Sequence, residues 1–228
     1  MNDEELNTLD YEMAIEIDKR TYFQYYWSLL KKKQLIIFTF FPNNDYNLFT
    51  IKICLFLTSF SLYFTINGFF FNDKTMHKIY KDNGVFNIIY RIPQIIYSSI
   101  ISSLIKTILT HFSLSEKNLL SLKRENNLKR LHNSSKQIKN CLKIKFIIFF
   151  ILNYIFLFFF WYFITCFCAA FINTQIILIT DTLISFGLSM LYPFGLNLIP
   201  GFFRIPALRA KKKDKKCIYK ISYVVALI

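Results

Sequence analysis

Residues 145–172 read KFIIFFILNYIFLFFFWYFITCFCAAFI, and no charged side chain follows Lys145 in this stretch. An α-helix rises about 1.5 Å per residue, so the part from Phe146 onward would reach about 40 Å. The hydrocarbon core of a bilayer is about 30 Å thick. The stretch therefore predicts a membrane-spanning helix, and no soluble domain of this size needs such a segment.

The composition of the whole chain indicates the same class of protein. Of its 228 residues, 54% are hydrophobic and 19% aromatic, and the formal net charge is +14. Such a charge would suggest nucleic-acid binding in a soluble protein, but no reader motif accompanies it. The basic residues cluster beside apolar stretches, where Lys and Arg orient spans and meet anionic headgroups. We therefore expect the lipid bilayer and anionic lipid headgroups as partners, and no nucleic acid.

Three further apolar stretches are long enough to cross a bilayer, and polar segments separate them. A turn is predicted at Asn83-Gly84, and the sequence NTQ at residues 173–175 predicts a tight hairpin. We expect an all-α polytopic membrane protein with four transmembrane helices and an N-terminal amphipathic and interfacial helix. The four spans are predicted at residues 51–71, 88–109, 146–172 and 176–199.

The segment before the first span changes character along its length. In residues 1–20, apolar residues recur at three- and four-residue spacing opposite seven acids, which predicts an amphipathic helix. That helix either packs on a neighbour or docks on a basic surface, such as the chain's own basic loop. Residues 21–41 combine an aromatic belt, three lysines and an apolar run too short to span. We expect an interfacial helix there, with a buried half-span as the alternative.

Positive charge lies mainly on one side of the predicted membrane domain. Residues 110–145 form a loop with nine Lys or Arg. Apolar residues interspersed among these bases predict a basic amphipathic helix or a helical pair in it, or a continuation of the third span. The lysines at 31–33 and after residue 209 fall on the same side. The positive-inside rule then places both termini in the cytosol. We predict three parts, which are a cytosolic segment at 1–34, a membrane domain at 35–209 and a basic cytosolic tail at 210–228.

Asp181 and Arg91 are charged residues inside predicted spans. A charge at the centre of a transmembrane helix costs roughly 2.5–3.5 kcal/mol on insertion scales, and less near the ends, so such residues face the bundle and find partners. Both spans are entered from the non-cytosolic side, and both residues lie near that end, so they should have similar depth. We expect either an ion pair that joins the second and fourth spans or a site for an ion or proton in a pathway.

The fourth span also contains residues that interrupt helices, because Pro lacks a backbone N–H and Gly has great backbone freedom. Broken helices line ion sites in some transporters, although Pro and Gly are also common in membrane helices generally. The helix-break candidates are Gly187, Pro193, Gly195, Pro200 and Gly201.

Catalytic signatures are missing from the sequence. It contains no glycine-rich phosphate loop, no GxSxG, no HExxH and no intramembrane Asp pair, so we predict no enzyme, no cofactor and no metal. The five cysteines show no disulfide framework. Cys141 and Cys217 are juxtamembrane and are candidates for S-palmitoylation, with ordinary reduced thiols as the alternative.

Four phrases resemble a conserved multi-pass region of uncharacterised protist transmembrane proteins. They are DKRTYFQYYWSLLKKK (18–33), FNDKTMHKIYKDNG (71–84), IPQIIYSSIISSLI (92–105) and DTLISFGLSMLYPFGLNLIPGFFRIPALR (181–209). In that family the region forms the C-terminal membrane part of longer chains, and the similarity covers about residues 5–209. The resemblance implies a multi-pass membrane fold, and it transfers no activity and no functional residue.

Two functions follow as expectations from these patterns. The first is a non-enzymatic membrane anchor or assembly scaffold with a basic cytosolic face that contacts anionic lipid or an acidic partner. The second is a channel or transporter subunit that uses the intramembrane Asp and the broken fourth helix. Either function accommodates a homo- or hetero-oligomer, and a continuous polar lining across several spans would favour transport.

Overall fold

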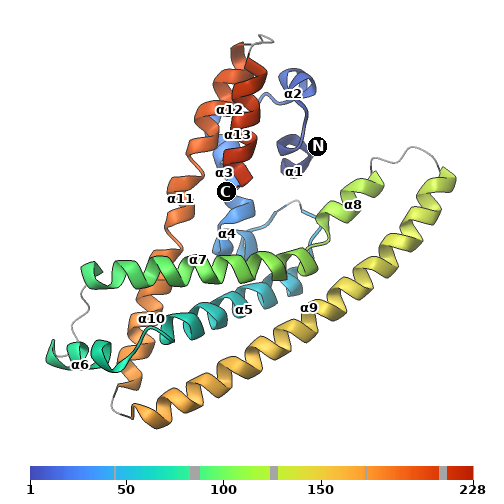
Figure 1. Cartoon of the computed structure of the whole chain (residues 1–228). Helices are drawn as coiled ribbons and strands as arrows, with labels where there is room; N and C mark the ends of the chain where they lie inside the picture. The colour runs from blue at the N-terminus through green and yellow to red at the C-terminus, as the bar shows by residue number, and fades with distance from the viewer. Residues whose placement is uncertain (44, 83–87, 124–127, 173, 211–214, 228) are drawn as a thin grey trace. The chain divides into compact units, whose positions relative to one another are not determined.

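A computed structural model of the chain describes residues 1–43, 45–82, 88–123, 128–172, 174–210 and 215–227 (Figure 1). The regular secondary structure within these ranges is entirely helical. The chain divides into two compact units, a central unit of Asn47–Ser189 and a terminal unit of Met1–Tyr46 and Met190–Ile228. The predicted turn at Asn83-Gly84, residue 173 of the predicted hairpin and the lysines at 211–213 lie outside the described residues.

Four helical stretches are long and apolar enough, by length and composition, to cross a membrane. They are Phe49–Gly68, Ile89–Ser113, Leu131–Ala170 and Gln175–Ala210. The prediction of an all-α polytopic protein is therefore confirmed, and the chain is membrane-embedded.

Helix α5 lies at the middle of the central unit. It packs against α7, α9 and α10, and α7 packs in turn against α9 and α10. Figure 1 shows α5 and α7 running side by side. The helices of the central unit are α5 (Phe49–Gly68), α6 (Asp73–Lys81), α7 (Ile88–Ser113), α8 (Glu116–Lys123), α9 (Leu128–Ala170) and α10 (Gln175–Ser189).

Helix α9 joins the basic loop to the third span without a break. It runs for 43 residues, and its sequence contains neither Gly nor Pro, the two residues that most strongly interrupt helices. The basic part at 128–145 is therefore a rigid extension of the apolar part. Of the alternatives that the sequence left open for this segment, the structure has the continuation of the third span.

The fourth apolar stretch, predicted at 176–199 with several candidate break points, is divided into three helices. Helix α10 ends at Ser189, α11 covers Tyr192–Leu196 and α12 covers Ile199–Ala210. Pro193 lies in the first turn of α11, where its missing N–H leaves no bond unmade. A continuous helix would need an N–H at residue 193 to bond to the Ser189 carbonyl, and proline has none, which is a reason for α10 to end at Ser189.

The terminal unit brings the two ends of the chain together. Its core packs Tyr11 and Ala14 of α2 against Ala207, Leu208 and Tyr219. Acidic and aromatic groups of the N-terminal segment explain this pairing, because they meet basic and aromatic groups of the C-terminal helices. The helices are α1 (Asp3–Asn7), α2 (Tyr11–Ile17), α3 (Tyr22–Lys33), α4 (Leu35–Phe40), α11, α12 and α13 (Lys216–Leu227).

The N-terminal acidic segment forms two short helices instead of one continuous amphipathic helix. Asn2 caps α1 in a capping box, and the backbone N–H of Thr8 closes its C-terminal end. The chain then restarts at α2, so the apolar stripe does not continue in one register. Met13 and Ile17 of that stripe are 49% and 45% exposed, whereas Tyr11 and Ala14 are buried.

Candidate functional site

Arg91 and Asp181 meet inside the central unit. Arg91 Nε lies 3.1 Å from Asp181 Oδ1, and the two side chains are 10% and 3% exposed. Arg91 comes from the first turn of α7 and Asp181 from the second turn of α10. The guanidinium group also lies over the ring of Phe71, 5.0 Å from its centroid. The structure thus brings together the two predicted charges, and each compensates the other.

Three polar side chains extend this ion pair into a network across α5, α7 and α10. The amide of Asn67 donates to Thr182 Oγ1 at 3.0 Å and approaches Asp181 Oδ2 at 3.4 Å. Gln94 Nε2 donates to Asn67 Oδ1 at 2.9 Å, and Arg91 Nη1 donates to Gln94 Oε1 at 2.9 Å. Interhelical hydrogen bonds of this kind hold membrane helices together.

Sequence reasoning missed Asn67, Gln94 and Thr182 as members of this site. Gln94 follows Arg91 at a spacing of three, and Thr182 is adjacent to Asp181. Helical neighbours at a spacing of three share a face, so Gln94 could have been found. Asn67, at the end of α5, carries no such spacing signal.

Three buried serine hydroxyls follow the ion pair along α7 and α10. Ser98 and Ser102 of α7 are 0% and 8% exposed, and Ser185 of α10 is 1% exposed. None of the three hydroxyl oxygens has a hydrogen-bond partner within the part of the chain that the structure describes. A buried hydroxyl without a partner costs free energy, so these groups require an explanation in any functional account.

A second polar contact ties α9 to α5. The hydroxyl of Thr58 donates to Asn153 Oδ1, and Thr58 and Asn153 are 0% and 9% exposed. Asn153 is the strongly polar residue in the interior of the long apolar stretch. Its partner on α5 gives it a structural role that the sequence did not indicate.

The helix-break candidates fall at different kinds of place. Gly187 lies inside α10 and Gly195 inside α11, and a side chain at either position would meet open space. Pro200 and Gly201 lie in the first turn of α12. A Cβ atom at Gly201 would lie 2.6 Å from the ring of Tyr22, so this glycine allows α12 and α3 to approach closely. None of the five residues contributes to the Arg91–Asp181 network.

A buried charge cluster centres on Asp18 in the terminal unit. Arg20 donates two hydrogen bonds to Asp18, each of 2.8 Å. Arg204 Nη2 donates to Asp18 Oδ2 at 2.9 Å and to the Leu6 carbonyl at 2.7 Å. Burial raises the pKa of Asp18, but the hydrogen bonds and charges of Arg20 and Arg204 outweigh it, so that the pKa lies below its ordinary value. The cluster therefore holds Asp18 as a carboxylate.

Two aromatic rings enclose Arg204 of this cluster. Its guanidinium carbon lies 4.9 Å from the ring centroid of Tyr25 and 4.8 Å from that of Tyr219. A desolvated cation over aromatic faces gains electrostatic attraction. Arg204 is 1% exposed, so the cluster is an internal support that solvent does not reach.

Three lysines of the terminal unit also have acidic partners. Lys32 donates to Glu4, Lys31 lies 3.7 Å from Asp3, and Lys216 lies 3.8 Å from Glu12. The acidic N-terminal segment therefore pairs with α3 and α13.

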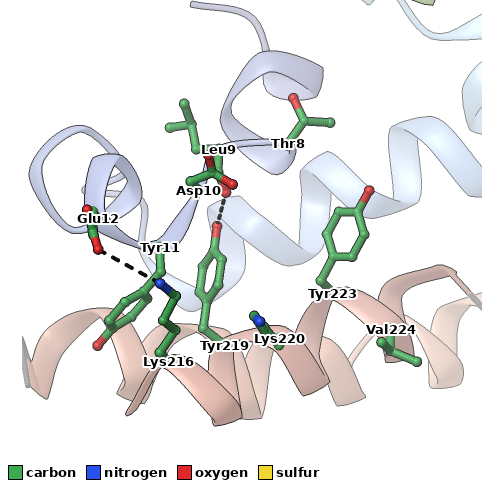
Figure 2. A pocket seen from close by; sticks show the side chains of 10 residues that line it. All are labelled: Thr8, Leu9, Asp10, Tyr11, Glu12, Lys216, Tyr219, Lys220, Tyr223 and Val224. Carbon is green, nitrogen blue, oxygen red and sulfur yellow. Dashed lines mark hydrogen bonds and ion pairs between the residues drawn. The ribbon is translucent and has the colours of Figure 1, made fainter. Parts of the chain in front are cut away.

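An open cleft of about 750 Å³ lies between residues 8–12 and α13. Figure 2 shows its two walls, linked by the hydrogen bond that Tyr219 donates to the Leu9 carbonyl and by the Lys216–Glu12 ion pair. The acids of one wall offset the lysines of the other. The cleft therefore offers no excess charge of either sign to a ligand.

Cys141 and Cys217, the palmitoylation candidates, are exposed free thiols on α9 and α13. No group of three or more His, Cys, Asp or Glu side chains among the described residues could hold a metal ion.

Comparisons with models of protein families, with curated proteins and with solved structures give no match for this chain.

Proposed function

We propose that the chain is a non-enzymatic membrane anchor or assembly scaffold. The observation that carries this proposal is the Arg91–Asp181 pair with its amide partners, because these two intramembrane charges are engaged with each other. Breaking such a buried pair is strongly destabilising. A network that joins three helices and leaves no net charge suits a structural role better than the binding of an ion.

The outward face of the proposed scaffold is the basic part of α9. With both termini in the cytosol, as the positive-inside rule suggests, this face lies on the cytosolic side. Anionic lipid headgroups or an acidic partner are its proposed contacts, and palmitoyl groups on Cys141 or Cys217 would add to the anchoring. Homo- or hetero-oligomers are compatible with this assignment.

A channel or transporter subunit is the second candidate, and the buried serines favour it. Ser98, Ser102 and Ser185 continue the polar network inward from the ion pair without finding partners of their own among the described residues. Hydroxyls in such positions can line a hydrated path for a proton or a small cation.

Ion flux through liposomes that contain the purified protein separates the two candidates. The wild type is measured beside Asp181→Asn and beside Ser103→Ala, a control on the exposed side of α7. The scaffold proposal expects no flux above that of protein-free liposomes, and a lower unfolding temperature for Asp181→Asn in detergent. Flux that the Asp181 substitution alters and the Ser103 substitution does not would replace it with the transport function.

A further inference from the structure

Three lysines form one stripe on the basic part of α9. Lys136, Lys139 and Lys143 are all exposed, and their spacings of three and four residues place them on one face of the helix. Leu131, Ile138 and Leu142 are less exposed and lie on another side. Helix α8 packs against α9 within the central unit. The lysine stripe lies on the side of α9 that α8 does not cover.

The same stripe continues into the apolar part of the helix. Phe150, Tyr154 and Trp161 follow Lys143 at spacings of seven, four and seven residues, which keep one face of a helix. They are 46%, 73% and 65% exposed. In a bilayer these large side chains contact acyl chains. The lysines therefore point toward the headgroups of the lipids that line this side of α9.

The unbroken helix also determines how far the lysines lie from the hydrocarbon. The charge-free run begins at Phe146. At about 1.5 Å per residue, Lys143, Lys139 and Lys136 lie about 4.5, 10 and 15 Å before it along the axis, and tilt shortens these depths. Headgroup layers extend roughly 5–8 Å beyond the hydrocarbon on each side. With their long side chains, Lys143 and Lys139 reach the phosphate level directly, and Lys136 reaches its outer edge.

The stripe has no internal counter-charge. Helix α9 contains no Asp or Glu, and Lys136, Lys139 and Lys143 form no ion pair with any residue that the structure describes. Lys145, on the packed side, instead donates to Asn118 at 3.4 Å. Three ammonium groups at the headgroup level thus stay available for an external anion.

We infer that Lys136, Lys139 and Lys143 form a binding site for anionic phospholipid headgroups, most favourably those that carry more than one phosphate. Lys143 and Lys139 hold the phosphate next to the glycerol, and Lys136 holds a phosphate farther from the membrane. This inference rests on the proposed function, in which the basic face of α9 meets the membrane surface. Each Lys near an anionic surface contributes about a fivefold gain in binding, and three together about a hundredfold.

Spin-labelled lipids test this site in vesicles that hold the full chain. The association of labelled phosphatidylinositol bisphosphate, phosphatidylserine and phosphatidylcholine is compared for the wild type and for Lys136→Gln/Lys139→Gln/Lys143→Gln. The matched control is Lys74→Gln/Lys78→Gln/Lys81→Gln, which removes three exposed lysines from α6. An all-arginine version of the stripe keeps the charge.

We expect the wild type, the α6 control and the arginine version to prefer the anionic lipids by at least about tenfold, with the bisphosphate first. The α9 glutamine variant should fall close to the phosphatidylcholine level while keeping the wild-type unfolding temperature in uncharged detergent. Equal lipid selectivity in the wild type and the glutamine variant would overturn the inference. A wild type without lipid selectivity at low salt would also overturn it, and an acidic protein would then be the remaining partner for this face of α9. The flux measurement tests the proposed function separately, because it does not depend on these lysines.

Discussion

Arg20 and Arg204 of the terminal unit share Asp18, whereas Lys136, Lys139 and Lys143 of α9 have no acidic partner among the described residues. In the terminal unit, the acids of the first twenty residues meet the bases of helices that are distant in sequence. On α9 the sequence supplies no acid at all. The basic residues that give the net charge of +14 therefore fall into two groups. One group pairs with acids and holds the fold together, and the other faces outward.

Arg91, paired with Asp181, belongs to the bases that hold the fold together, although the two residues lie in predicted spans. Their side chains are 10% and 3% exposed, and hydrogen bonds with neighbouring amides add to the pair. Removing one member of a compensated pair should affect stability, and removing an outward lysine should affect only external contacts. The following predictions test this difference, in order of decreasing effect.

The largest loss should follow removal of one intramembrane charge. Arg91→Met or Asp181→Leu should lower the free energy of unfolding of the central unit by about 3–5 kcal/mol, because the remaining charge is buried without a partner. The double variant should lose less than either single variant. Denaturant titration in detergent micelles measures these values, with Ser103→Ala as the control. A double variant as damaged as the sum of both single variants would show that the two residues do not interact.

A smaller loss should follow substitution of the shared carboxylate in the terminal unit. Asp18→Asn leaves two buried guanidinium groups facing a neutral amide, and we expect a loss of about 3 kcal/mol. Limited proteolysis of the N-terminal segment reports the opening of this unit. Protection equal to that of the wild type would contradict the assigned role of Asp18.

Acid should weaken the same cluster. The pKa of Asp18 is lower in the folded chain than in the unfolded chain, so the unfolded chain takes up this proton first as the pH falls. The stability that the ionised Asp18 contributes to the fold is complete above the ordinary carboxyl pKa of about 3.9. It is lost as the pH falls through that value toward the pKa of Asp18 in the folded chain. Unfolding temperatures between pH 6 and pH 2.5 should fall more steeply for the wild type than for Asp18→Asn. Parallel curves would exclude Asp18 as a source of this dependence.

The smallest effects concern exposed lysines. Lys32→Gln removes the pair with Glu4 and should cost about 0.5–1 kcal/mol. Lys136→Gln/Lys139→Gln/Lys143→Gln should change the free energy of unfolding by less than about 0.5 kcal/mol in uncharged detergent. Thermal unfolding of both proteins in the same micelle makes the comparison. A larger loss for the α9 variant would mean that its lysines support the fold.

Sequence reasoning could reach the Arg91–Asp181 contact because charges in apolar stretches are rare and the two residues have similar predicted depths. It could not reach Asn67, because an uncharged amide at the end of a helix has no such distinguishing signal. The Asp18–Arg204 contact was also out of reach, since 186 residues separate the two and both ends of the chain suggested solvated segments. The continuity of α9 was one of the alternatives that the sequence left open, and the absence of Gly and Pro between 128 and 170 favours it.

The break after Ser189 shows a different limit of the sequence. Several Gly and Pro residues could each have interrupted the fourth span, and their number gave no means of choosing among them. The structure places one interruption between Ser189 and Tyr192, another between Leu196 and Ile199, and leaves Gly187 inside a helix. Proline cannot donate to the carbonyl four residues before it, whereas a glycine in a packed membrane helix is tolerated.

Charge reversal at the intramembrane pair tests the central claim most directly. Arg91→Glu, Asp181→Arg and the protein with both changes are compared with the wild type by thermal unfolding in detergent. Asn67 and Gln94 carry both donor and acceptor atoms, so rotation of their amides can serve the exchanged charges. If the charges of the fold are compensated in pairs, each single reversal lowers the unfolding temperature strongly and the double reversal recovers most of the loss. A double reversal no more stable than the single variants would contradict this account.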